Sequence, residues 1–417
     1  MTTAQANTNT SAHFIELEDK FGAHNYKPLP VVLERASGVF MWDVEGKRYY
    51  DFLAAYSAVN QGHCHPRLVK VMQEQAEKLT LTSRAFYNNK LGEAERVLTE
   101  KFGYDKALLM NGGVEAVESA MKLARRWGYV KKGIPENEAV IVCAANNFHG
   151  RTLAVVSLST DRSARNNFGP FIKGIFLVPF NDLESLDKAL SNPNVCAYLV
   201  EPIQGEAGVI LPDDGYLKGA QEICKKHNVL FITDEIQSGL CRTGKMLAQH
   251  YEAGVHADVL ILGKALSGGM MPISAVLAND EVMLTINPGE HGSTFGGNPL
   301  AAAIAVEALH ILEEENLAEN AAKTGEIFRN YLREMQHPLI RIIRGKGLFN
   351  AIQIYDENNH DAAYDICKIM MKNGLLAKQT HGNVIRFAPP LCITEEQMLD
   401  CCEIIKSSIN QYAESLK

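Results

Sequence analysis

The chain has 417 residues, 41 Lys and Arg against 49 Asp and Glu, a formal net charge of −8, and 46% apolar residues. This composition is that of an ordinary globular protein and excludes a mainly disordered, collagenous or coiled-coil architecture. No apolar run approaches the ~20 residues that span a bilayer, and the acidic balance argues against nucleic acid as the main partner. We therefore expect neither a membrane nor a nucleic-acid partner.

The N-terminal segment is polar. Residues 1–21 contain neither an apolar signal core nor the Arg-rich, acid-poor pattern of a transit peptide. They predict a cytoplasmic location, and a mitochondrial one only if a leader was removed. The nine cysteines are an odd number without any Cys-x-x-Cys pair, so we expect reduced thiols and no metal site.

The first two thirds of the chain predict a sheet alternating with helices. Residues 40–53 predict two short strands around the Glu45-Gly46 turn. Helical patterns such as 215–228 separate later apolar runs. Five of these runs are typical of strands buried on both faces, namely 139–145, 175–180, 197–203, 229–236 and 258–266. This alternation predicts a doubly wound, mainly parallel α/β domain.

The composition changes after Pro299. Residues 300–335 form an Ala-, Glu- and Leu-rich helical region, and the stretches 347–354 and 383–391 follow as a smaller α/β part. We therefore predict three units: an N-terminal segment at 1–56, a large domain at 57–313 and a small C-terminal domain at 314–417.

A glycine-containing turn lies within residues 107–129. An apolar strand ends at Met110, the turn Asn111-Gly112-Gly113 follows, and an amphipathic helix begins. Glycines let the backbone approach an anion, and the free N–H groups of the helix then bind it. The pattern fits a phosphate site and, equally, a simple strand-to-helix turn. It is neither a GxGxxG nor a Walker motif, so dinucleotides and ATP are not indicated.

Charged residues end two of the apolar runs. Asp234 and Glu235 end one run and Lys264 ends another. Ligands of open α/β sheets bind at the carboxyl ends of strands, where these groups are expected. An acidic residue and a lysine at these positions, taken alone, are more simply explained as a surface salt bridge. A phosphate cradle, a carboxylate and a lysine together are what pyridoxal phosphate requires, because the lysine links to it and the carboxylate keeps its ring nitrogen protonated.

The stretch NNFHGRTL at 146–153 offers an aromatic ring and a cation. Phe148 could stack on a flat ring, and Arg151 could bind a carboxylate through two hydrogen bonds. The alternative is a helix start with a surface arginine. His149 fits a packing role and is assigned no function.

Two carboxylates and a distant arginine are further candidates. Glu201 and Glu206 follow a predicted strand in VEPIQGEAGV, and Arg386 lies in a mainly apolar run. A charge in apolar surroundings usually has a partner. We predict that Glu206 and Arg386 form a pair.

With these residues assembled, the chain from about Phe21 to its C-terminus resembles the class III (ω-amino acid) aminotransferases of pyridoxal-phosphate fold type I. The resemblance rests on long motifs, among them FGAHNYKPLPVVLERA (21–36), YSAVNQGHCHP (56–66), DEIQSGLCRTGK (234–245), LGKALSGGMMPISAV (262–276) and GEHGSTFGGNP (289–299). It implies a large doubly wound domain, a smaller C-terminal α/β domain, pyridoxal 5'-phosphate as cofactor and no metal.

Within the family, GAHNY, Tyr56 and HGSTFGGNP point to L-ornithine as the amino donor and 2-oxoglutarate as the acceptor. Transfer of the δ-amino group would give glutamate and glutamate 5-semialdehyde, which cyclises to pyrroline-5-carboxylate. N-acetylornithine or 4-aminobutyrate is the alternative donor.

The resemblance also implies roles toward the cofactor. Lys264 would bind it covalently and shuttle a proton, and Asp234 would pair with its ring nitrogen. A non-catalytic protein that kept the fold is the alternative, and Lys264 in its full motif argues against it. Gly112 stands where the family often has Ser or Thr, so only backbone contact is expected there. The other implied contacts fall on Gly113, Val114, Phe148, Gln237 and, from the neighbouring subunit of a homodimer with shared sites, Thr294.

The implied substrate site must accept two different substrates in turn. Tyr26 and Arg151 would hold the α-amino and α-carboxylate groups of ornithine, with Tyr56 lining the pocket. Glu206 paired with Arg386 would suit ornithine. An opened pair would let Arg386 bind the α-carboxylate of 2-oxoglutarate while Arg151 takes the distal one. A removable glutamate thus cancels a charge that would attract the wrong end of ornithine.

Overall fold

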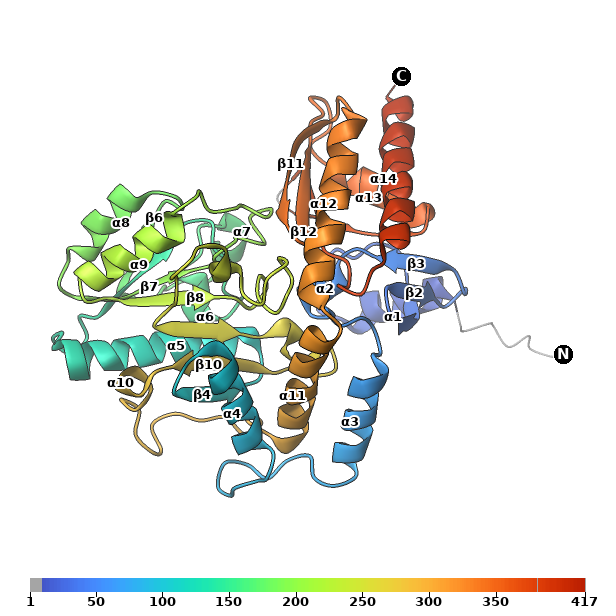
Figure 1. Ribbon diagram of the computed structural model, residues 1–417. Coiled ribbons are helices and arrows are strands. Elements are labelled where there is room, and N and C mark those ends of the chain that lie inside the picture. The colour runs from blue at the N-terminus through green and yellow to red at the C-terminus, as the bar shows by residue number, and fades with distance from the viewer. Residues whose placement is uncertain (1–9, 381, 417) are drawn as a thin grey trace.

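The computed structural model describes residues 10–380 and 382–416, so residues 1–9, His381 and Lys417 of the predicted terminal units lie outside the described residues. Its largest sheet has seven strands in the order β4-β10-β9-β8-β7-β5-β6 (Figure 1). Strands β5 to β9 pair in parallel, and β10 is antiparallel to β9 and β4. The mainly parallel sheet is thus confirmed. Its strands are β4 (Lys106–Met110), β5 (Val140–Ala144), β6 (Ile175–Val178), β7 (Val195–Val200), β8 (Leu230–Asp234), β9 (Val259–Leu262) and β10 (Ser274–Ala278).

Helices cover both faces of this sheet. Ile141 and Leu199 belong to the apolar cluster that contains α5, whereas Tyr198 and Phe231 belong to the cluster that contains α8 and α9. Side chains one residue apart on a strand point to opposite faces, so runs such as VCAYLV are apolar throughout. The covering helices are α5 (Gly113–Trp127), α8 (Leu183–Leu190) and α9 (Tyr216–Lys226).

Helices α11 and α3 lie to the lower right of the sheet in Figure 1, and α11 packs against α3, α4 and η3. The helical region predicted at 300–335 is two helices, because Asn316 adopts a positive φ of 51° between α11 and α12. None of the helices within the described ranges has the length and apolar character to cross a membrane. The helices introduced here, with the remaining short ones, are α3 (Pro66–Ala76), α4 (Leu91–Phe102), η1 (Gly128–Lys132), α6 (Leu153–Val156), α7 (Arg162–Arg165), η2 (Ala248–Tyr251), η3 (Lys264–Ser267), α10 (Asp280–Met283), α11 (Pro299–Glu314) and α12 (Leu317–Met335).

The C-terminal part is an antiparallel sheet, β11-β12-β15-β14, on which helices α12 and α13 pack, and α14 packs in turn against α12 and α13. The strand predicted at 347–354 begins only at Phe349. Gly347, with φ 53°, and Leu348 form the turn of the β11–β12 hairpin. The elements are β11 (Ile340–Lys346), β12 (Phe349–Ile354), α13 (Ala362–Lys372), β14 (Lys378–Thr380), β15 (Val384–Phe387) and α14 (Glu395–Ser415).

The N-terminal segment joins this C-terminal part through a small sheet, β1-β2-β3-β13. The strand pair predicted at 40–53 is present as β2 and β3, and β3 pairs in parallel with β13, with Tyr50 beside Leu375. The unit boundaries at residues 56 and 313 stay predictions. The elements are α1 (Ser11–Phe21), β1 (Leu33–Ser37), β2 (Phe40–Asp43), β3 (Arg48–Asp51), α2 (Ala54–Ser57) and β13 (Leu375–Leu376).

A fully buried arginine ties three distant segments together. Arg242 donates hydrogen bonds to the carbonyls of Leu348 (3.0 Å) and Pro389 (2.6 Å) and to Asn60 Oδ1 (2.5 Å). Burial lowers the pKa of its guanidinium to about 9, an effect that the charge of Asp51 partly opposes. Arg242 therefore links the segment after β8 to loops of the N- and C-terminal parts.

Candidate active site

The predicted site residues meet at the carboxyl ends of the central strands. Asp234 ends β8, Lys264 follows β9, and Phe148 follows β5. They line one cavity of about 200 Å³. The other residues that line it are Gly113, Val114, His149, Gly150, Glu201, Ile236 and Gln237. The topology therefore brings strand ends far apart in sequence to one place, as expected for an open α/β sheet.

Lys264 places an amine in this cavity. Its backbone has a positive φ of 44°, an uncommon conformation for a residue other than glycine. Burial lowers the pKa of its ammonium, and the carboxylates of Asp234 and Glu206 oppose that effect in part. A lysine of lowered pKa holds more of the neutral amine, which is the form that attacks a carbonyl carbon or accepts a proton.

His149 is a site residue that the sequence analysis missed. Its Nδ1 lies 2.7 Å from Asp234 Oδ2, and both side chains are buried. Burial alone would lower the pKa of His149, but the hydrogen bond and charge of Asp234 raise it above its ordinary value. Its Nε2 is buried without a hydrogen-bond partner among the described residues. Its position directly after Phe148 was the only signal in the sequence.

Glu201 connects the two loops that carry Phe148 and Glu206. Its carboxylate accepts the backbone N–H of Phe148 at 2.8 Å and of Gly205 at 3.3 Å. Burial raises the pKa of Glu201 to about 7, although the nearby His149 favours the charged form. The sequence analysis named Glu201 as a candidate but predicted no partner for it. In the structure its hydrogen bonds hold the two loops together.

The turn before α5 is the candidate anion cradle. The carboxylate of Glu115 accepts the N–H groups of Asn111 (2.8 Å) and Gly112 (3.0 Å). Gly113 and Val114 come next, line the cavity, and lie at the N-terminus of a 15-residue helix, where backbone N–H groups and the helix dipole favour a phosphate. The cradle, Asp234 with its histidine and the half-buried Lys264 fit the phosphate, the ring nitrogen and the aldehyde of pyridoxal phosphate.

A larger cavity of about 960 Å³ adjoins the first. Tyr26, Tyr56, Arg151, Glu206 and Arg386 line it together with Lys264. The predicted Glu206–Arg386 contact is present, with Nη1 and Oε1 2.6 Å apart. Burial alone would raise the pKa of Glu206, but the charge and hydrogen bond of Arg386 hold it below its ordinary value. The pair therefore favours an ionised Glu206 that neutralises Arg386.

The other predicted residues differ in exposure. Tyr26 is largely exposed, with the ammonium of Lys378 5.5 Å from its ring centre. The ring of Tyr56 lies 5.3 Å from the Arg386 guanidinium, in a turn whose residues 54–57 all have positive φ. The Tyr56 carbonyl accepts a hydrogen bond from Gln237 at 3.3 Å. Thr294 is exposed and lies outside both cavities.

Glu235, next to Asp234, makes stability depend on pH. Burial raises its pKa to about 7 from an ordinary 4.5, while its carboxylate accepts the Gln249 N–H (2.7 Å) and the Ser238 hydroxyl (2.6 Å). The native state therefore retains a proton that the unfolded chain loses, so the free energy of unfolding falls as pH rises from 4.5 to 7. Glu235→Gln removes this titration. We therefore expect the free energy of unfolding of the variant minus that of the wild type to rise by about 2 kcal/mol between pH 5 and pH 8, as measured by urea unfolding. An equal dependence of the free energy of unfolding on pH in both proteins would contradict this. The raised pKa of Glu201 contributes equally to both proteins, so it does not affect the difference.

Comparison with known proteins gives a consistent family. The model of the family "Aminotransferase class-III" matches residues 21–409. A Caenorhabditis elegans protein named "Probable ornithine aminotransferase, mitochondrial" is 58% identical, over 97% of this chain and 95% of the relative. The solved ornithine aminotransferase of Toxoplasma gondii has a TM-score of 0.95 at 48% identity, over 97% and 96% of the two chains. An acetylornithine aminotransferase from Elizabethkingia anophelis has a TM-score of 0.88 at 55% identity, over 96% and 99%. On its motifs, its fold and these matches, the chain belongs to the class III aminotransferases, enzymes that use pyridoxal phosphate.

Proposed function

We propose that this aminotransferase transfers the δ-amino group of L-ornithine to 2-oxoglutarate, giving glutamate 5-semialdehyde, which cyclises to pyrroline-5-carboxylate, and glutamate. The observation that carries the proposal is the pair of buried Arg386 and partly buried Glu206, in a cavity that also holds Arg151 and Lys264. With Arg386 neutralised, the cavity has one available guanidinium for a carboxylate. A substrate with one carboxylate then presents its distal amine to Lys264.

The residues divide the chemistry between them. Pyridoxal phosphate supplies an electron sink when it is bound. Gly113 and Val114 would hold its phosphate, and Phe148 would stack on its ring. Asp234, oriented by His149, would keep a proton on the ring nitrogen. Lys264 Nζ would hold the cofactor and then carry a proton to and from the reacting carbon.

The two arginines would act at different stages of a ping-pong cycle. In the first half-reaction Arg151 and Tyr26 bind the α-carboxylate and α-amino group of ornithine while Tyr56 lines the cavity. In the second, Arg386 leaves Glu206 and binds the α-carboxylate of 2-oxoglutarate. The distal carboxylate of 2-oxoglutarate then binds Arg151, where the α-carboxylate of ornithine was bound in the first half-reaction.

N-acetylornithine is the second candidate donor, favoured by the 55% identity to the Elizabethkingia anophelis enzyme. The test is the absorbance of the yellow cofactor, followed after addition of ornithine, N-acetylornithine or 4-aminobutyrate in parallel. Bleaching by ornithine, with pyrroline-5-carboxylate formed, is the expected result. Bleaching by N-acetylornithine or 4-aminobutyrate in place of ornithine would overturn the donor but not the family.

Glu206→Ala should weaken the choice between amino groups. The variant leaves Arg386 unpaired and buried, so it attracts the α-carboxylate of donors such as glutamate. We expect the ratio of kcat/KM for ornithine to kcat/KM for glutamate to fall at least about tenfold, the equivalent of 1.4 kcal/mol. An unchanged ratio would contradict the switch. Glu315→Ala, a change at an exposed glutamate outside this cavity, is the matched control.

We further propose a homodimer with shared sites and a cytoplasmic location. Thr294 is exposed beside Phe295, and Phe86 and Tyr87 are also strongly exposed, as expected of a surface that a partner covers. Thr294 would then reach the neighbouring phosphate. Equilibrium sedimentation tests the dimer. The location is tested by fractionating cells of the source organism, and relatives in worm and fly are named mitochondrial.

A further inference from the structure

The two arginines of the substrate cavity have carboxylate partners of different strength. Arg386 Nη1 is 2.6 Å from Glu206, and the two side chains are 4% and 23% exposed. Arg151 Nη1 is 3.9 Å from Asp161 Oδ2, and these side chains are 59% and 29% exposed. Because water screens an exposed pair, the Arg151–Asp161 pair opens at little cost. Arg151 is therefore the first to be available to a substrate.

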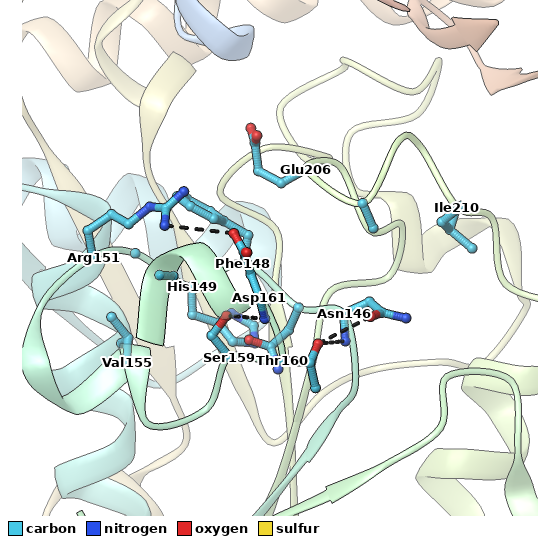
Figure 2. Close-up of a pocket in the computed structure, with 14 residues that line it drawn as sticks. Asn146, Phe148, His149, Arg151, Val155, Ser159, Thr160, Asp161, Glu206 and Ile210 are labelled. Carbon is cyan, nitrogen blue, oxygen red and sulfur yellow. Dashed lines mark hydrogen bonds and ion pairs between the residues drawn. The ribbon is translucent and has the colours of Figure 1, made fainter. Parts of the chain in front are cut away.

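Asp161 lies in a side cavity of about 350 Å³ that adjoins the substrate cavity (Figure 2). Phe148, Arg151, Ala164 and Glu206 line both cavities. In Figure 2 the Arg151 guanidinium points toward the Asp161 carboxylate, with Glu206 nearby across the same opening. A carboxylate bound by Arg151 thus meets the negative charge of Asp161.

The local structure holds Asp161 in place. Its side chain caps α7 by accepting the Ser163 N–H at 2.8 Å, and its own N–H donates to the Ser159 hydroxyl at 3.0 Å. Asp161 therefore stays where it is when the longer, more exposed Arg151 side chain turns to a substrate. Arg151 can return to a fixed counter-charge each time a product leaves.

We propose that Asp161 sets the affinity of the cavity for carboxylate substrates by competing with the substrate carboxylate for Arg151. The proposal rests on the proposed function, in which Arg151 binds and releases a carboxylate in both half-reactions. A fixed competing anion weakens each of these complexes by a similar factor. It thereby raises KM for ornithine and for 2-oxoglutarate, without touching the reacting atoms.

The test is Asp161→Asn, which removes the charge and keeps a residue of equal quality as helix cap. At low ionic strength we expect KM for ornithine and for 2-oxoglutarate to fall about two- to fivefold, with kcat not increased. Pentanoate, a carboxylate without an amine, should inhibit more strongly by the same factor. Pentylamine, which has no carboxylate, should inhibit no more strongly than before. The gain should shrink in about 0.5 M salt, because the Debye length becomes only a few ångströms.

Two controls complete the design. Asp182 caps α8 through Ser185 in the same way and lines none of these cavities, so Asp182→Asn should change no constant. Adding Asp161→Asn to Arg151→Met should have no effect on pentanoate inhibition. Unchanged or weaker pentanoate inhibition in the single variant would overturn the proposal. Failure of the proposed function is a separate result, namely a wild-type enzyme that does not turn over ornithine.

Discussion

Lys264→Ala should lower transamination by at least about 10³-fold, because it removes the amine of lowered pKa proposed both to hold the cofactor and to carry the proton. The measurement is the rate of pyrroline-5-carboxylate formation from ornithine and 2-oxoglutarate at saturating pyridoxal phosphate. Lys264→Arg should be nearly as inactive, because a guanidinium stays protonated and supplies no neutral amine.

Lys245→Ala is the matched control, since Lys245 is an exposed lysine of the neighbouring motif. It should retain wild-type turnover. Added methylamine should restore part of the activity of Lys264→Ala, which separates loss of the amine from misfolding. A Lys264→Ala enzyme with more than about a tenth of wild-type activity would contradict the assignment.

Arg242→Met should cost about 3–5 kcal/mol of the free energy of unfolding, the largest stability effect expected here. The substitution leaves the carbonyls of Leu348 and Pro389 and the Asn60 amide oxygen buried without their donor. Each such unsatisfied acceptor costs about 1–3 kcal/mol. The measurement is urea unfolding of the holoenzyme, read by fluorescence.

Arg333→Met serves as the control, because Arg333 is half-exposed and pairs with Glu326 at the surface. It should cost less than about 1 kcal/mol. A loss below about 1 kcal/mol in Arg242→Met would show that the three segments hold together without this arginine.

Much of the large sheet and of the site's position could be predicted from the sequence. Strands buried on both faces are apolar throughout, so their ends at Met110, Asp234 and Lys264 were visible as the first polar residues or turns. Topology then determines that these ends meet. The Glu206–Arg386 contact could be predicted because an arginine inside an apolar run needs a partner.

Other features leave no such trace. Strand β11, IRIIRGK, is half-exposed and charged, so it lacks the continuous apolar pattern. Arg242 sits in SGLCRTGK, which is polar like a surface turn, although its side chain is fully buried. His149 has no partner near it in sequence, because Asp234 lies 85 residues away. Long-range polar pairing is a property of the assembled fold.

The pairing of β3 with β13 has a consequence for how the chain is made. Tyr50 lies beside Leu375, and the Phe52 carbonyl accepts the N–H of Ala388 at 2.8 Å. The N-terminal strands emerge first during synthesis but find their last hydrogen-bond partners only when the final tenth of the chain exists. Domains usually fold in the order of synthesis, and contacts of large sequence separation form slowly. A nascent chain truncated before residue 375 should therefore expose the β3 edge to chaperones and to proteases.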